Sequence, residues 1–279
     1  MDMKRVGILY HPMIEAAYNL ANELQQVLTS EGISVWLCSA WEGERAKAQV
    51  NHTDLILTIG GDGTILRAAQ VVVLSQTPIT GINLGKLGFM TELNADEAMA
   101  KLPALLAGKG WIDERAMLEA ELSPSNHEPS RIFYALNDVV VSRGTIARVV
   151  YIDASIDGEL LTTYKADGVI VATATGSTGY SLAAGGPILH PQAKDFLLLP
   201  MLPHLSSAYC LVLSATAVVK LRVNTAHQAM LSIDGHINLP LNSGAGITVK
   251  HSSATARFLR VYPETSFYGS LELRLKGKQ

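Results

Sequence analysis

The sequence is short of cysteine, of charge and of long apolar segments, and each shortage argues against a class of protein. Cys38 and Cys210 are its only cysteines, so neither a disulfide-stabilised fold nor a cysteine-based zinc site is expected. The apolar run at 196–205 contains Pro200 and Pro203 and stays well below the ~20 residues that a bilayer-spanning helix needs. The apolar stretch near the N-terminus is too short for a signal peptide and lacks a small-residue cleavage site. We therefore expect a soluble, cytoplasmic protein with no membrane association.

Charged residues make up 17% of the chain, below the ~25% usual in soluble domains, whereas hydrophobic residues make up 48%. The chain can thus bury a large core, and a disordered protein is excluded. The net charge of −3 argues against nucleic-acid binding as the main task. The low charge and the apolar run at 196–202 indicate apolar surface covered by another subunit, so we expect a homodimer or homotetramer.

The first part of the chain alternates between two hydrophobic periods. Short apolar runs typical of buried strands occur at 6–10, 33–38, 55–59 and 79–83. Helical spacing occurs at 17–28 and 64–73, and a capping-box pattern begins a third helix at 94–106. This alternation predicts a Rossmann-like α/β domain with a mostly parallel sheet, at residues 1–110.

After residue 110 the strand-like segments follow one another without helices between them. They lie at 117–122, 133–142, 149–156, 169–172, 211–213, 218–223, 230–233, 247–250 and 258–261. Asp157-Gly158 suits a two-residue hairpin turn. We expect a β-rich second domain at 111–262, a sandwich or a closed antiparallel sheet, followed by a short amphipathic helix at 267–275.

Gly60-Gly61-Asp62-Gly63 lies directly between a predicted strand and a predicted helix. Bare backbone at the start of a helix suits a phosphate group. A carboxylate repels phosphate, so Asp62 needs a cation, a metal ion or a hydroxyl group beside it. This requirement fits a carboxylate that accepts a proton or positions Mg²⁺. The alternative is an ordinary tight turn. Neither a Walker A sequence nor the G-x-G-x-x-G pattern is present.

Two further segments are candidates for ligand binding. Residues 173–187 are rich in hydroxyl groups and glycines, which could surround a polar ligand and leave space for a flat ring; the alternative is a surface loop. Asn137-Asp138 interrupts an apolar strand. This pair either faces solvent or binds the hydroxyl or amine groups of a ligand.

Together these segments resemble one family, the NAD kinases. The family's motifs appear in order at 60–64, 83–89, 136–139, 165–168, 175–187 and 233–235. The first motif alone is weak, because diacylglycerol-type lipid kinases and phosphofructokinases share it. All six together are highly specific and cover nearly the whole chain.

The resemblance implies an N-terminal α/β domain, a C-terminal β-rich domain with the active site between them, and a C-terminal tail at 263–279 that returns to the first domain. It also implies phosphorylation of the 2′-hydroxyl of the adenosine ribose of NAD, with ATP or polyphosphate as the donor. The cofactor would be Mg²⁺ or another divalent cation, and the assembly a homodimer or homotetramer.

The resemblance also implies roles for particular residues. Asp62 would be the general base, and the cation would be held mainly by the phosphates rather than by a protein site. The donor-phosphate loop would comprise Gly60, Gly61, Gly63 and Thr64. NAD would contact Asp62, Gly63, Asn137, Asp138, Arg148, Lys165, Asp167, Thr178, Gly179, Tyr180, Ser181, Leu182, Ala183 and His236.

The sequence departs from the family pattern at three positions. Gly179 stands where alanine is usual, Ala174 replaces a common proline, and His236 occupies a position often held by glutamine or glutamate. These changes bear on affinity more than on activity. Two alternatives remain open: a diacylglycerol-type lipid kinase, which would not keep both Asn137-Asp138 and the 175–181 segment, and a non-catalytic NAD-binding regulator, against which the retention of Asp62 speaks.

Overall fold

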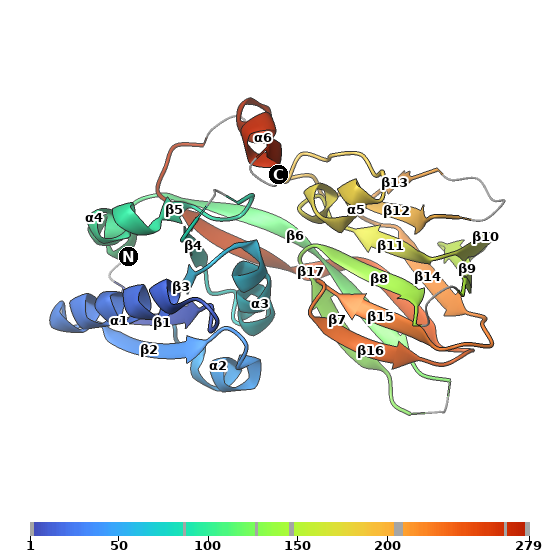
Figure 1. Ribbon diagram of the computed structural model, residues 1–279, viewed down its shortest axis with the longest axis horizontal. Coiled ribbons are helices and arrows are strands. Elements are labelled where there is room, and N and C mark those ends of the chain that lie inside the picture. Colours follow the sequence, from blue (N-terminus) through green and yellow to red (C-terminus); the bar gives the residue numbers. More distant parts are fainter. Residues whose placement is uncertain are drawn as a thin grey trace. The chain divides into compact units, whose positions relative to one another are not determined.

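The computed structural model describes residues 3–85, 88–125, 128–144, 148–203, 209–264 and 267–276. The chain divides into two compact units, unit 1 at residues 1–114 and 255–279 and unit 2 at residues 115–254 (Figure 1). The divisions expected at 110 and 262 differ from these because the chain passes between the units inside two unbroken strands, β6 (Trp111–Ser123) and β17 (Gly246–Arg260). No change in composition marks either passage.

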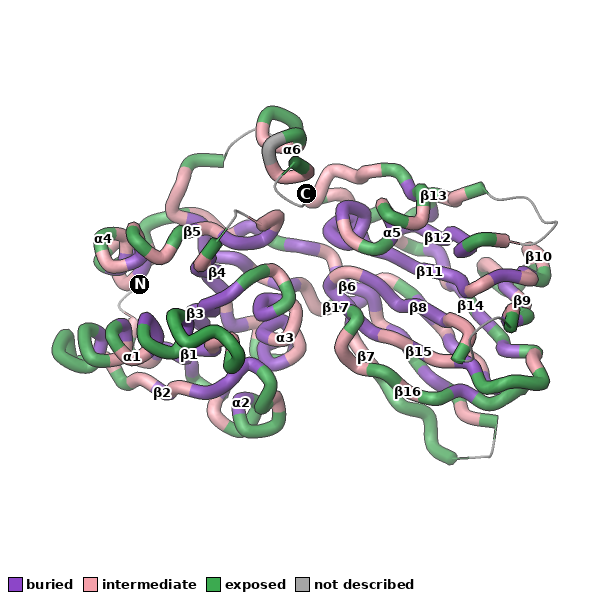
Figure 2. The backbone as a smooth tube through the Cα atoms, viewed as in Figure 1, coloured by how far each residue is buried: buried purple, intermediate pink, exposed green. Residues whose placement is uncertain are grey.

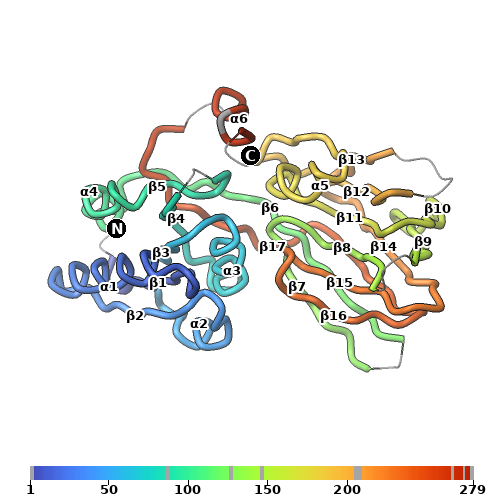
Figure 3. The backbone as a smooth tube through the Cα atoms, in the orientation of Figure 1, coloured from blue at the N-terminus to red at the C-terminus, as the bar shows by residue number. Residues whose placement is uncertain are grey.

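Unit 1 is built on a parallel sheet. Its strands lie in the order β2 (Ser34–Ser39), β1 (Arg5–Tyr10), β3 (Leu55–Ile59), β4 (Ile79–Asn83), with the short β5 (Leu93–Asn94) also paired to β4. The second half of β17 runs parallel to β4, where Phe258 pairs with Ile79 (Figure 3). Every residue of β3 and β4 is buried, as expected for strands covered on both faces.

Helices cover both faces of this sheet. On one face, α1 (Glu15–Ser30) and α4 (Ala95–Leu106) share a core cluster with β1 and β3. On the other face lies α3 (Asp62–Val72), where Ile65 comes so close to β4 that a Cβ on Gly81 would lie 2.6 Å from its Cδ1. The expected strands, helices and capping box of this unit are present. The short α2 (Gly43–Gln49), which lacks an apolar period, was not expected.

Unit 2 is a β-sandwich, one of the two expected forms. One sheet has the order β10 (Glu159–Ala166), β9 (Val150–Ile156), β14 (Val218–Val223), β17, and a hairpin of β6 with β7 (Arg131–Ala135) belongs to it. The other has the order β13 (Leu211–Leu213), β12 (Phe196–Met201), β11 (Gly168–Ala172), β8 (Asp138–Arg143), β15 (Ala229–Ile233), β16 (Ile237–Leu241). One core cluster takes side chains from both sheets, and the tube in Figure 2 is buried along these central strands.

Three expectations for unit 2 are corrected. The single strand predicted at 133–142 is two, β7 and β8, separated at Leu136-Asn137. The strands predicted at 247–250 and 258–261 are parts of one, β17, and β16 was not anticipated, whereas the predicted hairpin turn at Asp157-Gly158 is confirmed and joins β9 to β10. The apolar run expected to be covered by another subunit is buried within the chain as β12, between β11 and β13, so it no longer indicates a subunit contact.

The C-terminal tail belongs to unit 1. Its helix α6 (Phe267–Lys276) contacts the segment after β4, where the Arg274 guanidinium donates a hydrogen bond to the Gly88 carbonyl oxygen. Among the described residues, no helix has both the length and the hydropathy required to cross a membrane.

Candidate active site

Asp62 is the first residue of α3, directly after the glycine pair that follows β3. Gly60 has φ +151°, and a Cβ there would lie 2.3 Å from Thr64 Oγ1, so only glycine fits. Gly61 and Gly63 are exposed, with nothing within 4 Å of an added Cβ. Because the first N–H groups of a helix have no intrahelical acceptor, this open side of the loop can accept an anion.

Thr64 is buried, as Gly60 is, whereas Gly61 and Gly63 of the predicted phosphate loop are exposed. The Thr64 side chain is 1% exposed, and its backbone N–H donates to the Gly61 carbonyl oxygen at 2.9 Å. Neither its hydroxyl nor its N–H therefore lies on the open side of the loop. Thr64 packs against Gly60 and shapes the turn.

The Asp62 carboxylate is held by the backbone of the segment that follows β4. Oδ2 accepts a hydrogen bond from the Phe89 N–H at 3.0 Å, and Oδ1 accepts one from the Met90 N–H at 3.1 Å. Gly88 lies against the same carboxylate, since a Cβ there would be 2.2 Å from Asp62 Oδ1. Two of the sequence motifs thus meet at Asp62. Lys86 and Leu87, within the second motif, lie outside the described residues.

Unit 2 contains a pocket of about 460 Å³ with several polar side chains in its lining. It brings together three predicted NAD contacts, Asn137, Asp138 and Tyr180. The other lining residues are Val140, Ser142, Met230, Ser232, Asp234, Gly235 and Asn238. The two serines and Asn238 were missed because each lies on a strand with no local motif. Asp234 and Gly235 were quoted as a family motif without an assigned role.

Asp234 organises this pocket through the backbone. Its carboxylate accepts hydrogen bonds from the N–H groups of Leu136, Asn137 and Asp138, at 2.9, 2.7 and 3.1 Å. These N–H groups would otherwise be free to pair with a neighbouring strand. The three bonds explain why the predicted strand is interrupted at 136–137 and why Asn137 faces the pocket.

Asp138 is a buried carboxyl group, only 5% exposed. Burial is the larger cause and the nearby Asp234 carboxylate the smaller one, and together they raise its pKa from 3.8 to about 7. The adjacent Asn137 Oδ1 is buried and has no hydrogen-bond partner within the described chain. A buried acceptor without a partner in the described chain, next to a buried carboxyl group, indicates a ligand that supplies hydroxyl or amine hydrogens.

The 173–187 loop packs against this pair rather than lying free at the surface. A Cβ on Gly176 would lie 2.1 Å from the Asn137 carbonyl oxygen, so this glycine permits close packing. A Cβ on Gly179 would lie 3.6 Å from Asn137 Nδ2. Thr178 and Ser181 are buried, and Leu182 and Ala183 belong to the short helix α5 (Tyr180–Ala183).

Eleven of the fourteen predicted NAD contacts lie outside the lining of this pocket. Besides Asp62 and Gly63 of unit 1 and five residues of the 178–183 region, these are Arg148, Lys165, Asp167 and His236. Arg148 lines a second pocket of about 780 Å³ that shares no lining residue with the first. The Lys165 ammonium lies 5.9 Å from the ring centre of Tyr151, which lines that second pocket. Asp167 forms an ion pair with Arg143 at 3.1 Å, and His236 Nδ1 lies 3.2 Å from the Asp234 carbonyl oxygen.

The fold and these two sites define a class of protein. A carboxylate in a glycine loop at the end of a parallel strand, and a separate pocket for a ligand rich in hydrogen donors, are the parts of a two-domain kinase. Comparison with known proteins narrows the class. The model of the ATP-NAD kinase N-terminal domain matches residues 33–110, and that of the ATP-NAD kinase C-terminal domain matches residues 136–261.

Relatives and solved structures agree with these matches. An NAD kinase from Dehalococcoides mccartyi is 50% identical over 98% of this chain and 96% of its own, and one from Chloroflexus aurantiacus is 39% identical over 98% and 99%. The structure of yeast NADH kinase complexed with NADH has a TM-score of 0.82 at 26% identity, covering 98% of this chain and 88% of its own. An Archaeoglobus fulgidus NAD kinase in complex with ATP has a TM-score of 0.79 at 24% identity, covering 98% and 99%, and supports the fold.

The chain belongs to the NAD kinase family and is a phosphotransferase. The lipid-kinase alternative is set aside, because both domain models and full-length relatives point to the same family.

Proposed function

We propose that the protein transfers the terminal phosphoryl group of ATP, or of polyphosphate, to the 2′-hydroxyl of the adenosine ribose of NAD, giving NADP. In this reaction the O–P bond to the leaving phosphate breaks, a bond forms from the 2′-oxygen to phosphorus, and the hydroxyl proton goes to Asp62. The observation that carries the proposal is the Asp62 carboxylate, fixed by two backbone N–H groups beside an open glycine loop.

Asp62 has the capacity that a general base needs. Each carboxylate oxygen accepts one backbone hydrogen bond and keeps a further lone-pair direction for a hydroxyl group. The carboxylate is also oriented before substrate arrives, which lowers the cost of aligning base and hydroxyl.

The donor phosphates are proposed to bind at the exposed backbone of Gly61 and Gly63, beside Gly60. Among the described residues, no three His, Cys, Asp or Glu side chains lie close enough together to hold a metal ion. We therefore propose that Mg²⁺, or another divalent cation, is bound chiefly through the donor phosphates, whose negative charge it neutralises.

NAD is proposed to bind at the unit 2 pocket. Asn137 Oδ1 has no hydrogen-bond partner among the described residues, and with the buried Asp138 carboxyl group it is suited to ribose hydroxyl or amide hydrogens. Tyr180, which is 52% exposed, offers an aromatic ring at the same pocket. The Thr178–Ala183 region would line the adenine and ribose. Arg148, Lys165, Asp167 and His236 remain predicted contacts that lie outside this pocket.

A coupled assay tests the proposal directly. Purified protein is mixed with NAD, ATP and Mg²⁺, and NADP is measured with an NADP-specific dehydrogenase. Asp62→Asn is expected to lower kcat by about 10²–10⁴, the usual contribution of a general base, while NAD still binds in a direct titration. Turnover close to normal in this variant would remove Asp62 as the base, and binding without turnover in the unmodified chain would indicate a regulator.

A control separates the base from its support. Asparagine keeps only one acceptor oxygen, so Asp62→Asn also deprives one backbone N–H of its partner. Thr91→Val disturbs the same segment and leaves the carboxylate intact, because Thr91 Oγ1 accepts a hydrogen bond from the Gly88 N–H at 3.0 Å. If Asp62→Asn and Thr91→Val lost equal activity, the loss would come from disturbing the segment 88–91 and not from removing the base.

We also propose that the chain forms a homodimer or homotetramer. Unit 2 exposes large apolar side chains at Leu160, Leu202 and Val212, which are 71%, 77% and 54% exposed. Light scattering should give two or four times the chain mass of 29.9 kDa, and a single-chain mass at micromolar concentration would contradict the proposal. The cytoplasmic location stays a prediction from the sequence.

A further inference from the structure

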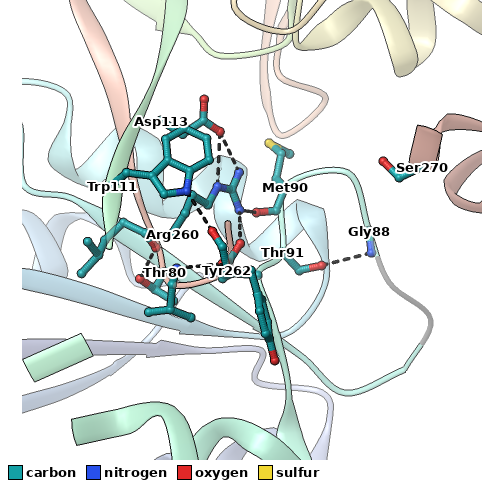
Figure 4. A network of polar contacts seen from close by, with 12 residues as sticks. Thr80, Gly88, Met90, Thr91, Trp111, Asp113, Arg260, Tyr262 and Ser270 are labelled. Atoms are coloured by element: carbon teal, nitrogen blue, oxygen red, sulfur yellow. Dashed lines mark hydrogen bonds and ion pairs between the residues drawn. The ribbon is translucent and has the colours of Figure 1, made fainter. Parts of the chain in front are cut away.

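A buried ion network around Arg260 contacts Met90, one of the residues whose backbone N–H groups hold Asp62 (Figure 4). Arg260, at the end of β17, is 6% exposed. Its Nε and Nη2 both donate to Asp113 Oδ2, at 3.2 and 3.1 Å, and its Nη1 lies 3.3 Å from Glu92 Oε2. These are the most deeply buried ion pairs in the described part of the chain, and all three residues belong to unit 1.

The same guanidinium directly contacts the segment 88–90, which holds the Asp62 carboxylate and is called here the Asp62 support. Arg260 Nη1 donates to the Met90 carbonyl oxygen at 2.8 Å, and the Met90 N–H donates to Asp62 Oδ1 at 3.1 Å. Met90 is buried, 3% exposed, and both contacts are direct hydrogen bonds. Met90 is therefore held on one side by Arg260 and holds the carboxylate on the other.

Glu92 joins the segment after Met90 to the residues that directly follow β17. Its Oε1 accepts hydrogen bonds from the Val261 and Tyr262 N–H groups, at 2.8 and 2.9 Å. The other Glu92 oxygen faces Arg260, so one side chain ties the end of β17 to the segment after Met90. The network spans about 170 residues of sequence, since Arg260 and Met90 are 170 positions apart.

Stability alone is a weak reason for such a network. Taking three charged groups out of water costs as much as, or more than, their attraction returns, and apolar side chains of similar size often serve as well. What an arginine supplies and an apolar side chain cannot is a rigid set of donors at fixed angles. Here one of those donors is used on a backbone carbonyl that leads to the catalytic carboxylate.

We propose that Arg260 is a positioning residue for the phosphoryl transfer: its guanidinium, held by Asp113 and Glu92, fixes Met90 and through it the orientation of the Asp62 carboxylate. The inference rests on the proposed role of Asp62 as the base. It adds a residue far from the glycine loop in sequence, with no contact to either substrate required.

Arg260→Lys is the informative variant, with Arg257→Lys as its matched control. Lysine keeps the charge that Asp113 and Glu92 need but has a single nitrogen, which the carboxylates engage in preference to a neutral carbonyl. The Met90 contact is then lost. Arg257 lies on the same strand but contacts Glu114 and the Gln76 carbonyl oxygen, at 3.5 and 3.4 Å, away from Met90.

We expect Arg260→Lys to lower kcat about ten-fold, with the KM and the directly titrated Kd for NAD unchanged, because misplacing a catalytic group costs turnover and not binding. Hydrogen exchange measured by mass spectrometry on a peptide covering residues 88–92 should become faster in this variant. Arg257→Lys should change neither quantity. An unchanged kcat, or unchanged exchange at 88–92, would overturn the inference, and so would a fall in kcat matched by an equal fall in NAD affinity.

Two further measurements keep the result interpretable. If Arg260→Lys does not fold, the combination Glu92→Gln, Asp113→Asn and Arg260→Met removes all three charges, and the same kcat and exchange results are expected of it. Asp62→Asn is measured in parallel. Normal turnover in that variant would refute the proposed base, whereas exchange at 88–92 would still report separately whether Arg260 holds the segment.

Discussion

Gly88 lies directly against the Asp62 carboxylate and leaves no space for a side chain of its own. A Cβ at Gly88 would lie 2.2 Å from Asp62 Oδ1 and 2.8 Å from Cγ, closer than real Cβ contacts come. Gly88→Ala must therefore displace either the carboxylate or the backbone that holds it. We expect kcat to fall by about 10²-fold in the coupled assay, since a displacement of about 1 Å has that effect.

Gly85 provides the control in the same motif. A Cβ there has nothing within 4 Å, and Gly85 is exposed. Gly85→Ala should keep most of the activity that Gly88→Ala loses. Equal losses in both variants would mean that the motif needs glycine for backbone freedom and not for space beside Asp62.

Asp138 gives the protein a pH dependence near neutrality. Its pKa is raised to about 7, first by burial and then by Asp234, so the carboxyl is mostly protonated below that pH. Ligand hydroxyl groups donate better to the ionised form. We expect the KM for NAD to fall about ten-fold as pH rises from about 6 to about 8. Over this range the ionised fraction of a carboxyl group with a pKa of about 7 rises from about one tenth to about nine tenths. Asp138→Asn should have a higher KM that varies little over this range.

The same shift predicts how stability changes with pH. Between the ordinary pKa of 3.8 and the raised value of about 7, the folded chain keeps a proton at Asp138 that the unfolded chain has lost. The contribution of Asp138 to the free energy of unfolding therefore falls as pH rises through this window and is constant above it. In urea denaturation, Asp138→Asn should have a higher free energy of unfolding than the parent chain at about pH 8, and this difference should shrink towards about pH 5. A difference independent of pH would refute the assigned titration.

At the scale of elements, local sequence indicated most strands and helices, and its failures have non-local causes. The strand predicted at 133–142 is interrupted because the Asp234 carboxylate accepts hydrogen bonds from three successive N–H groups, those of residues 136–138, which lie almost 100 positions earlier in the sequence. An apolar window cannot reveal such a partner. Likewise, β12 looked like an exposed apolar run, because nothing local shows that β11 and β13 flank it.

Helix α6 touches the Asp62 support from the opposite end of the chain. The Arg274 guanidinium donates to the Gly88 carbonyl oxygen, while Lys276, in the next half-turn, pairs with Glu272 on the same helix at 2.6 Å. Arg274→Ala should lower kcat several-fold, less than Gly88→Ala, because one partly exposed contact is removed and the segment keeps its others. Lys276→Ala is the control and should have no effect. Equal kcat values in the two variants would show that α6 does not steady this segment.

At the scale of the whole molecule, the six motifs sort into the two units. The glycine loop and the 83–89 motif meet around Asp62 in unit 1, whereas the 136–139, 175–187 and 233–235 motifs meet around one pocket in unit 2. The sixth motif, at 165–168, belongs to unit 2 but does not line that pocket. Residue types and order were enough to indicate the motifs and the family. They could not show that Asp234 shapes the pocket, that Thr64 is buried, or that Arg260 supports Asp62, because each of these depends on contacts between distant segments.

The division into units predicts how fragments of the chain behave. Unit 2 is continuous in sequence at 115–254 and has its own core cluster, whereas unit 1 needs two separate segments. A fragment of residues 115–254 should fold, give a cooperative thermal transition by circular dichroism, and bind NAD weakly without turnover, since the Asn137 pocket is complete and Asp62 is absent.

A fragment of residues 1–114 should not fold, because it lacks the core residue Leu259 and leaves Asp113 and Glu92 buried without Arg260. A folded 1–114 fragment, or an unfolded 115–254 fragment, would show that the cores do not follow this division.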